Sequence, residues 1–261
     1  MQGTIGSVRG LASKAFVLGL AGALGGVAAL PYTLELLGAS LGQVAAEADL
    51  PVGALFLLSL GQGFVVYTVV AFFGLQFAGA SGLRAPVVDA IVTTRRPAFQ
   101  GHWWAVGIGT GLVGGGAVWL VASVFPGLPS ELHALPVPRP ISGLMAALHG
   151  AIGEELIGRL LILSLVLAVL RGTAADEDGR QTPKFWVANV VAALAFGALH
   201  APALVLAGVP LTPAVWAYLL TLNGGIGVAF GWLYARYGLE VAMLGHFVAD
   251  VLLHAIAPAL L

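Results

Sequence analysis

The sequence predicts an all-α protein, a single transmembrane domain spanning residues 1–261 and built as a polytopic bundle of about seven membrane-crossing helices. Of the 261 residues, 59% are hydrophobic and only 9% are charged, whereas a soluble domain carries about 25% charged residues. A water-soluble fold of this length could not bury so much apolar surface, and a lipid bilayer removes the need to bury it. The apolar residues also gather into long segments separated by polar loops, as in multi-pass membrane proteins.

Seven segments are long enough for a helix to cross the bilayer. The second and fourth are long enough to tilt or to include a short interfacial piece. The first follows two basic residues, as a secretory signal does, but the loops alternate in charge only when it is counted as a retained helix. Between the first two spans, residues 34–48 predict a helix on the membrane surface. The expected spans are 15–30, 51–79, 103–125, 142–170, 185–207, 213–235 and 241–260.

The basic residues favour one side of the membrane. Nine of the eleven lie in the N-terminal segment and in alternate loops, only Arg139 lies in the other loops, and Arg159 falls inside a span. Because cytoplasmic loops carry the excess of Lys and Arg, the N-terminus is expected in the cytoplasm and the C-terminus outside, in the cell inner membrane. The nine residues are Arg9, Lys14, Arg84, Arg95, Arg96, Arg171, Arg180, Lys184 and Arg236.

Composition also excludes some functions. The net charge is −1 and no basic tract alternates with aromatic residues, so no nucleic-acid partner is expected. The chain has no cysteine, which excludes thiol catalysis, disulfide bonds and thiolate metal sites. The expected partners are the lipid bilayer and a ligand or substrate that binds at a site within the membrane.

Six of the ionisable residues within the predicted spans form the candidate polar set. An unpaired charge at the bilayer centre costs roughly 2.5–3.5 kcal/mol on insertion scales, so each should be paired or functional. Glu155 and Arg159 are spaced i, i+4 with the acid first, which suits an ion pair. Glu154 lies about 100° further around the helix, has no sequence-local partner and is free to face a cavity. The six residues are Glu154, Glu155, Arg159, His200, His246 and Asp250.

Two later spans bring further polar groups to the same region. Phe196 and His200 lie on one face of the fifth span, and His246, Asp250 and His254 share a face of the seventh. The fourth, fifth and seventh spans can therefore form one active site within the membrane. A carboxylate there could activate water as a general base, a histidine could carry the proton, and donors on another helix could stabilise an oxyanion.

The three motifs together resemble those of the CPBP family of CAAX proteases and bacteriocin-processing enzymes, also called the Abi family. The resemblance covers about residues 142–256 and implies an intramembrane endopeptidase that cleaves a membrane-anchored or membrane-proximal polypeptide. Ras-converting members of the family remove the C-terminal tripeptide of prenylated CAAX proteins, and tail removal during protein sorting is a related possibility. The motifs are Glu154-Glu155-x-x-x-Arg159, Phe196-x-x-x-His200 and His246-x-x-x-Asp250.

The resemblance also implies roles for the residues. Glu154 would activate water with His200 as its partner, and His246 with Asp250 would bind the oxyanion. The supporting residues would be Glu155, Arg159 and Phe196. Asp250 departs from the family pattern, which often has asparagine there, so it is either protonated, or orients His246, or binds a metal. No cofactor is expected, although Zn²⁺ held by the four catalytic side chains is an alternative; no HExxH motif supports it.

Several points stay open at this level. A non-catalytic membrane protein, such as a bacteriocin-immunity or transport factor, could use the same buried polar groups for binding. His149 is expected to be structural, and the role of His254 is undecided. Residues 1–140 carry no recognisable motif and could hold the specificity. On straight spans His200 would lie about 24 Å from Lys184 and His246 about 9 Å from Glu240. A shared site therefore requires helix tilt, a buried helix start near Val241, or an amphipathic entry around residues 184–187.

Overall fold

The computed structural model describes residues 2–96 and 100–260, and in this part of the chain every regular element is a helix. In chain order the elements are α1 (Gln2–Leu36), α2 (Leu41–Glu47), α3 (Val52–Ala80), α4 (Pro86–Thr93), α5 (His102–Val124), α6 (Ser130–His133), α7 (Pro140–His149), η1 (Gly150–Glu154), η2 (Leu156–Leu163), α8 (Ser164–Val169), α9 (Pro183–Ala198), α10 (Ala201–Leu206), α11 (Pro213–Tyr237), α12 (Leu239–Asp250), η3 (Val251–Ile256) and η4 (Ala257–Leu260). The predicted all-α class is confirmed.

Among the described residues, six helices are long and apolar enough to cross a membrane, which agrees with an integral multi-pass protein. The predicted fourth span is a helical run over residues 140–169, in which the π-helices η1 and η2 separate the shorter α7 and α8. The expected count of seven spans therefore stays a prediction. The six helices are Arg9–Leu36, Val52–Ala80, His102–Val124, Pro183–Leu206, Pro213–Tyr237 and Leu239–Ala259.

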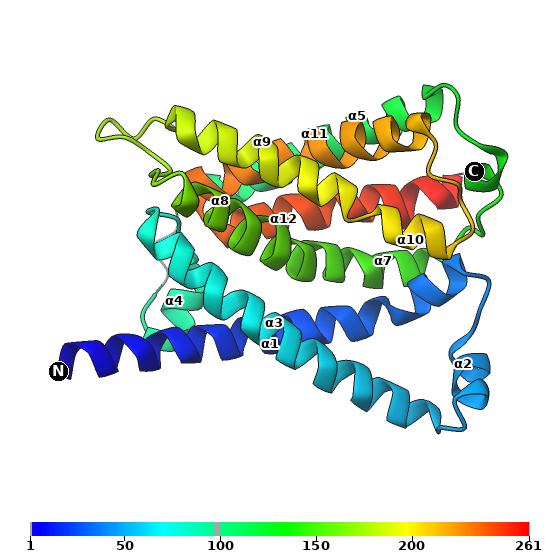
Figure 1. Cartoon of the computed structure of the whole chain (residues 1–261), viewed down its shortest axis with the longest axis horizontal. Helices are drawn as coiled ribbons and strands as arrows, with labels where there is room; N and C mark the ends of the chain where they lie inside the picture. The colour runs from blue at the N-terminus through cyan, green and yellow to red at the C-terminus, as the bar shows by residue number, and fades with distance from the viewer. Residues whose placement is uncertain (1, 97–99, 261) are drawn as a thin grey trace.

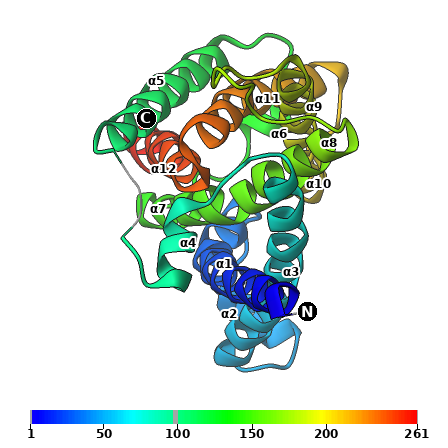
Figure 2. The same cartoon turned by 90° about the vertical axis from the view of Figure 1, so that its left-hand side faces the viewer.

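The run 140–169 lies between two groups of helices (Figure 2). On one side α1 packs against α3, and on the other α5, α9, α11 and α12 pack together. Leu156, Leu160, Leu163 and Leu167 of this run are fully buried. The side chains that the run carries are therefore held inside the protein from both sides.

The ends of the bundle separate as the charge pattern predicts. The start of α1, helix α4 and the loop between α8 and α9 gather at one end, while η4 lies at the other (Figure 1). Lys14 forms an ion pair with Asp89 of α4, and Arg236 donates a hydrogen bond to the Gly179 carbonyl of the loop (3.2 Å). Basic segments far apart in sequence thus meet at one end, although which end faces the cytoplasm stays a prediction.

The expected surface helix over residues 34–48 is wrong in its extent. Helix α1 continues to Leu36, and Gly38 turns the chain with a φ of +68° before the short α2 begins. Ser40 starts α2 through a capping box, since its hydroxyl accepts from the Gln43 amide while the Gln43 side chain accepts from the Ser40 amide. Seven residues, rather than fifteen, form the separate helix.

The fifth span is broken beside His200. Helix α9 ends at Ala198, and α10 begins at Ala201 with Pro202 in its first turn. Proline lacks an amide hydrogen, and its ring clashes with the carbonyl four residues earlier, here that of Ala198. His200 therefore lies in a two-residue turn between two helices.

The seventh span begins inside the protein. Leu239 and Val241 are fully buried, and the Leu239 amide donates to the Arg84 carbonyl (3.0 Å). The Glu240 carboxylate accepts from the amides of Val87 and Val88 at the start of α4 (2.8 and 3.0 Å). The structure has a buried helix start near Val241, one of the adjustments that the sequence left open, and His246 of this helix reaches Glu155.

Close glycine packing holds α12 in place. Gly107, Gly111 and Gly115 form a buried stripe on α5 that faces α12. A methyl group at Gly111 would overlap the carbonyl of Gly245, and one at Gly115 would lie 3.0 Å from the Ala249 Cα. The four-residue spacing of glycines at 107 and 111 thus reflects close helix contact.

Candidate active site

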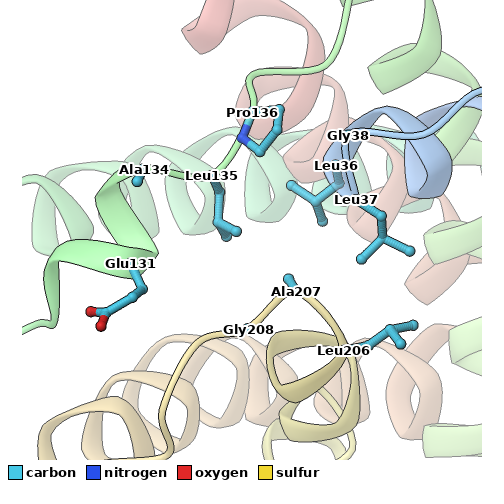
Figure 3. A pocket seen from close by; sticks show the side chains of 10 residues that line it. All are labelled: Leu36, Leu37, Gly38, Glu131, Ala134, Leu135, Pro136, Leu206, Ala207 and Gly208. Carbon is cyan, nitrogen blue, oxygen red and sulfur yellow. The ribbon is translucent and has the colours of Figure 1, made fainter.

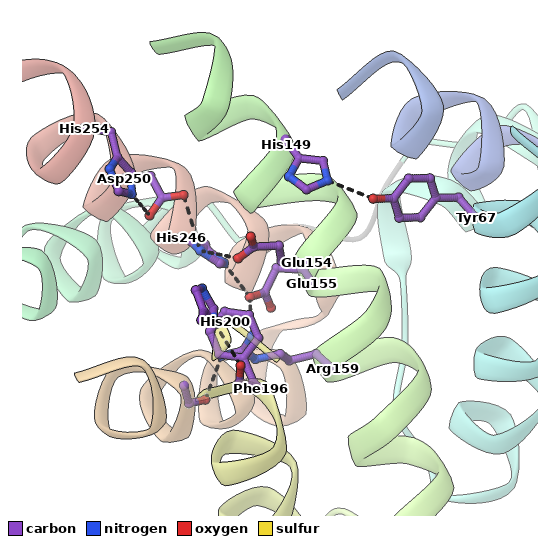
Figure 4. Close-up of polar contacts among 11 residues, drawn as sticks. Tyr67, His149, Glu154, Glu155, Arg159, Phe196, His200, His246, Asp250 and His254 are labelled. Carbon is purple, nitrogen blue, oxygen red and sulfur yellow. Dashed lines mark hydrogen bonds and ion pairs between the residues drawn. The ribbon is translucent and has the colours of Figure 1, made fainter. Parts of the chain in front are cut away.

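Glu155 and Arg159 form the buried base of the site (Figure 4). Their side chains are 0% and 3% exposed, and Arg159 Nη1 lies 2.9 Å from Glu155 Oε1. Arg159 Nη2 donates to the Gly227 carbonyl of α11 (3.1 Å), and the guanidinium lies over the rings of Phe196 and Phe230 at 4.5 and 5.5 Å. The expected ion pair is confirmed, and the cation–π contacts add to its support.

Glu155 has a second partner that the sequence did not predict. His246 Nδ1 lies 2.7 Å from Glu155 Oε1, and the imidazole stacks on Phe230 with ring centroids 4.8 Å apart. Because an ionised carboxylate can only accept, Nδ1 carries the hydrogen in this bond. The bond fixes the ring orientation and turns Nε2 toward the other carboxylates.

Glu154 and Asp250 face this second nitrogen of His246. Glu154 Oε2 lies 3.7 Å and Asp250 Oδ2 lies 3.4 Å from His246 Nε2. The Glu154 side chain is 29% exposed and the Asp250 side chain 13% exposed. Within the described residues Glu154 accepts no hydrogen bond from the protein, in contrast to the buried Glu155. Of the two adjacent glutamates, Glu154 is the one left open to a ligand.

His200 lies across the Phe196 ring from this group. Its Nδ1 is 3.0 Å from the Phe196 carbonyl, so Nδ1 donates and Nε2 is left as the acceptor. The Phe196 ring packs edge-on against His200 and His246, with centroids 4.9 and 6.0 Å away. Among the described residues no hydrogen bond or ion pair joins His200 to Glu154, so their partnership stays a prediction.

Two glycines allow the helices to approach at the site. A methyl group at Gly150 would overlap the Asp250 carboxylate and would lie 3.3 Å from His246 Nε2. A methyl group at Gly153 would lie 2.6 Å from the Tyr67 hydroxyl. Both glycines fall in the π-helix η1, a type of turn that is frequent at functional sites.

The N-terminal half contributes two tyrosines that sequence reasoning missed. Tyr67 of α3 bonds His149 through its hydroxyl group (2.8 Å to Nε2), and Tyr32 of α1 bonds His254 (2.9 Å to Nδ1). Residues 1–140 carry no motif, so only the unexplained histidines could have signalled these contacts. His149 is held by Tyr67 in agreement with its expected structural role.

Zn²⁺ is the alternative cofactor for the four polar side chains of the site. The expected ligands were the two carboxylates of Glu154 and Asp250 with His200 and His246. Across residues 2–96 and 100–260, no three His, Asp or Glu side chains gather closely enough to hold a metal ion. Whether the protein uses a metal stays a prediction, and no step below depends on one.

A separate pocket of about 500 Å³ lies at the end of the bundle where α1 finishes (Figure 3). Its walls come from the end of α1, the segment around Leu135 and the end of α10. None of the polar residues described above lines it. Helix α10 connects the two regions, since His200 precedes it and Leu206 lines the pocket.

Comparison with known proteins gave one match. The model of the type II CAAX prenyl endopeptidase Rce1-like family matches residues 136–252. No curated protein and no solved structure matched the chain. The matched segment starts just before α7, ends two residues after Asp250, and contains all three motifs. The resemblance read from the motifs is therefore confirmed over residues 136–252, which are similar to the Rce1-like type II CAAX prenyl endopeptidase family.

Proposed function

We propose that the protein is an intramembrane endopeptidase that hydrolyses a peptide bond in a membrane-anchored or membrane-proximal polypeptide, with Glu154 activating the water. The family match supports a membrane endopeptidase in general. The observation that carries the finer proposal is the contrast between neighbouring carboxylates. Glu155 is fully buried and bound to Arg159 and His246, whereas Glu154 is partly exposed and accepts no hydrogen bond from the described part of the chain.

In the proposed reaction Glu154 takes a proton from water as the oxygen attacks the substrate carbonyl carbon. His246, carrying a hydrogen on each ring nitrogen, donates through Nδ1 to Glu155 and through Nε2 to the carbonyl oxygen, where it stabilises the developing negative charge. The C–N bond then breaks, and the proton reaches the leaving amine from Glu154 or through His200 Nε2. Asp250 lies beside His246 Nε2 and would orient it, the second of the roles left open by the sequence.

The test is cleavage of membrane-anchored reporter polypeptides, including CAAX-terminated and tail-anchored ones, in membranes that contain the wild type or Glu154→Gln. Glutamine keeps the size of the side chain but cannot take the proton, so cleavage should fall by roughly 10²–10⁴-fold. Glu177→Gln, in an exposed loop, is the matched control and should cleave like the wild type. A chelator should leave the wild-type rate unchanged if no metal takes part.

Two results would argue against the proposal. Unchanged cleavage in Glu154→Gln would remove Glu154 from the reaction, and chelator-sensitive cleavage would indicate a metal enzyme. If the wild type cleaves none of the reporters, while Glu154→Gln still supports the biological role in cells, a non-catalytic binding or transport function would be favoured instead.

A further inference from the structure

A second series of polar contacts reaches the site from the C-terminal part of α1. The hydroxyl group of Tyr32 lies 2.9 Å from His254 Nδ1, and His254 Nε2 lies 3.9 Å from Asp250 Oδ1. The other carboxylate oxygen of Asp250 faces His246 Nε2 at 3.4 Å. Both oxygens of Asp250 thus face an imidazole, one on each side (Figure 4).

The hydrogen positions follow from the partners. The Tyr32 hydroxyl can donate to His254 Nδ1, which leaves Nε2 as the N–H that points toward Asp250. The Tyr32 and His254 rings also meet edge-on, with centroids 5.3 Å apart. The separation of 3.9 Å is too long for a hydrogen bond but short enough for electrostatic attraction, and one water could bridge it.

We propose that His254, held by Tyr32, is a positioning residue that fixes the Asp250 carboxylate beside His246. The proposal rests on the proposed function and assigns a role to a histidine outside the three motifs. It also gives a physical reason for aspartate rather than asparagine at position 250. The negative charge of Asp250 has a partner, His254, one turn later on the same helix.

The alternative use of His254 is packing alone, and the geometry argues against it. Its side chain is 38% exposed, so it fills little of the core, yet both ring nitrogens are directed at polar atoms. Gly143 supports this placement, because a methyl group there would overlap the His254 backbone carbonyl. The absence of a side chain at Gly143 therefore lets η3 pack closely against α7.

The first test is a cycle of variants in the cleavage assay. His254→Ala should lower kcat roughly 10-fold with little change in KM, because Asp250 loses one of its two partners. In an Asp250→Asn background the same change should matter less than about 2-fold, since an amide has no charge to be balanced. His133→Ala, an exposed histidine on α6, is the matched control and should be silent.

The second test does not depend on activity. Diethyl pyrocarbonate modifies accessible histidines, and mass spectrometry gives the rate at His254 with His133 as the internal reference. Tyr32→Phe should raise the rate at His254 because it frees Nδ1, the ring nitrogen with the lone pair. Asp250→Asn should raise it because the electrostatic attraction that holds the ring beside Asp250 is lost. Equal rates in all three proteins would overturn the proposed contact, whether or not any reporter is cleaved.

The two tests separate the possible failures. If His254→Ala has the same effect in the wild-type background as in the Asp250→Asn background, the positioning role is refuted while the endopeptidase function stands. A wild type that cleaves nothing would count against the proposed function, and the labelling rates would still decide whether Tyr32, His254 and Asp250 form one chain.

Discussion

Replacing Arg159 with methionine should be the most destabilising single change in the site. Methionine keeps much of the apolar length of the side chain but removes the charge that faces Glu155. The remaining carboxylate would be fully buried, with His246 as its one remaining partner among the described residues. Breaking a buried ion pair by removing one member is costly because the other charge stays in a medium that solvates it poorly.

The size of the effect can be worked from the geometry. Two unit charges 2.9 Å apart attract with about 6 kcal/mol at an effective dielectric constant of 20. Most of this attraction offsets the desolvation of both groups, so the expected net loss is about 3–5 kcal/mol, as for other broken buried pairs. Loss of the cation–π contacts with Phe196 and Phe230 would lower the stability of the variant further.

The measurement is thermal unfolding of the purified protein in detergent micelles. At about 2–4 °C for each kcal/mol in a chain of this size, Arg159→Met should lower Tm by about 6–20 °C. Glu155→Leu combined with Arg159→Met removes both charges, so it should regain much of the lost stability but not the activity, since His246 loses its orienting bond. A double variant less stable than Arg159→Met would refute the reasoning.

Two further predictions concern the helix approaches around η1. Gly150→Ala should lower cleavage by at least about 10-fold while the protein still folds, because the added methyl group displaces the Asp250 carboxylate. The measurement is the cleavage rate of the wild type and the variant at equal amounts of folded protein. An undiminished rate would contradict the close approach of Gly150 to Asp250. Tyr67→Phe should cost about 1 kcal/mol of stability, read from the unfolding midpoint, because the buried hydrogen bond to His149 is lost without a change in packing. Addition of His149→Phe should cost less than the sum of the two single changes if the two side chains are partners.

The helical class and the ion pair were predictable because they depend on local patterns. Long apolar segments predict spans, and the four-residue spacing of Glu155 and Arg159 places both on one helix face. The meeting of His246 with Glu155 was not predictable, since it depends on how two helices 91 residues apart in sequence are turned toward each other. The depth of His246 likewise depends on the buried start of α12, which a hydropathy window does not register.

The tyrosine contacts show a second limit of sequence reasoning. Tyr67 lies inside the apolar second span and Tyr32 just beyond the expected end of the first, and neither belongs to a motif. Their hydroxyl groups gain a role only through packing of α1 and α3 against the run 140–169. The π-helices were missed as well, because the apolar spacing within the run fits an ordinary α-helix.

The position of Arg159 on the same helix as Glu155 also bears on how the chain enters the membrane during synthesis. His246 follows Glu155 by 91 residues, which at about 5–20 residues per second are translated some 5–18 s later. Over that interval the buried glutamate cannot rely on its histidine partner, but the arginine is one turn away and available as soon as the helix forms. The segment can thus pass from the translocon to lipid with Glu155 already paired, and the last helix then completes a site whose buried charge has been balanced beforehand.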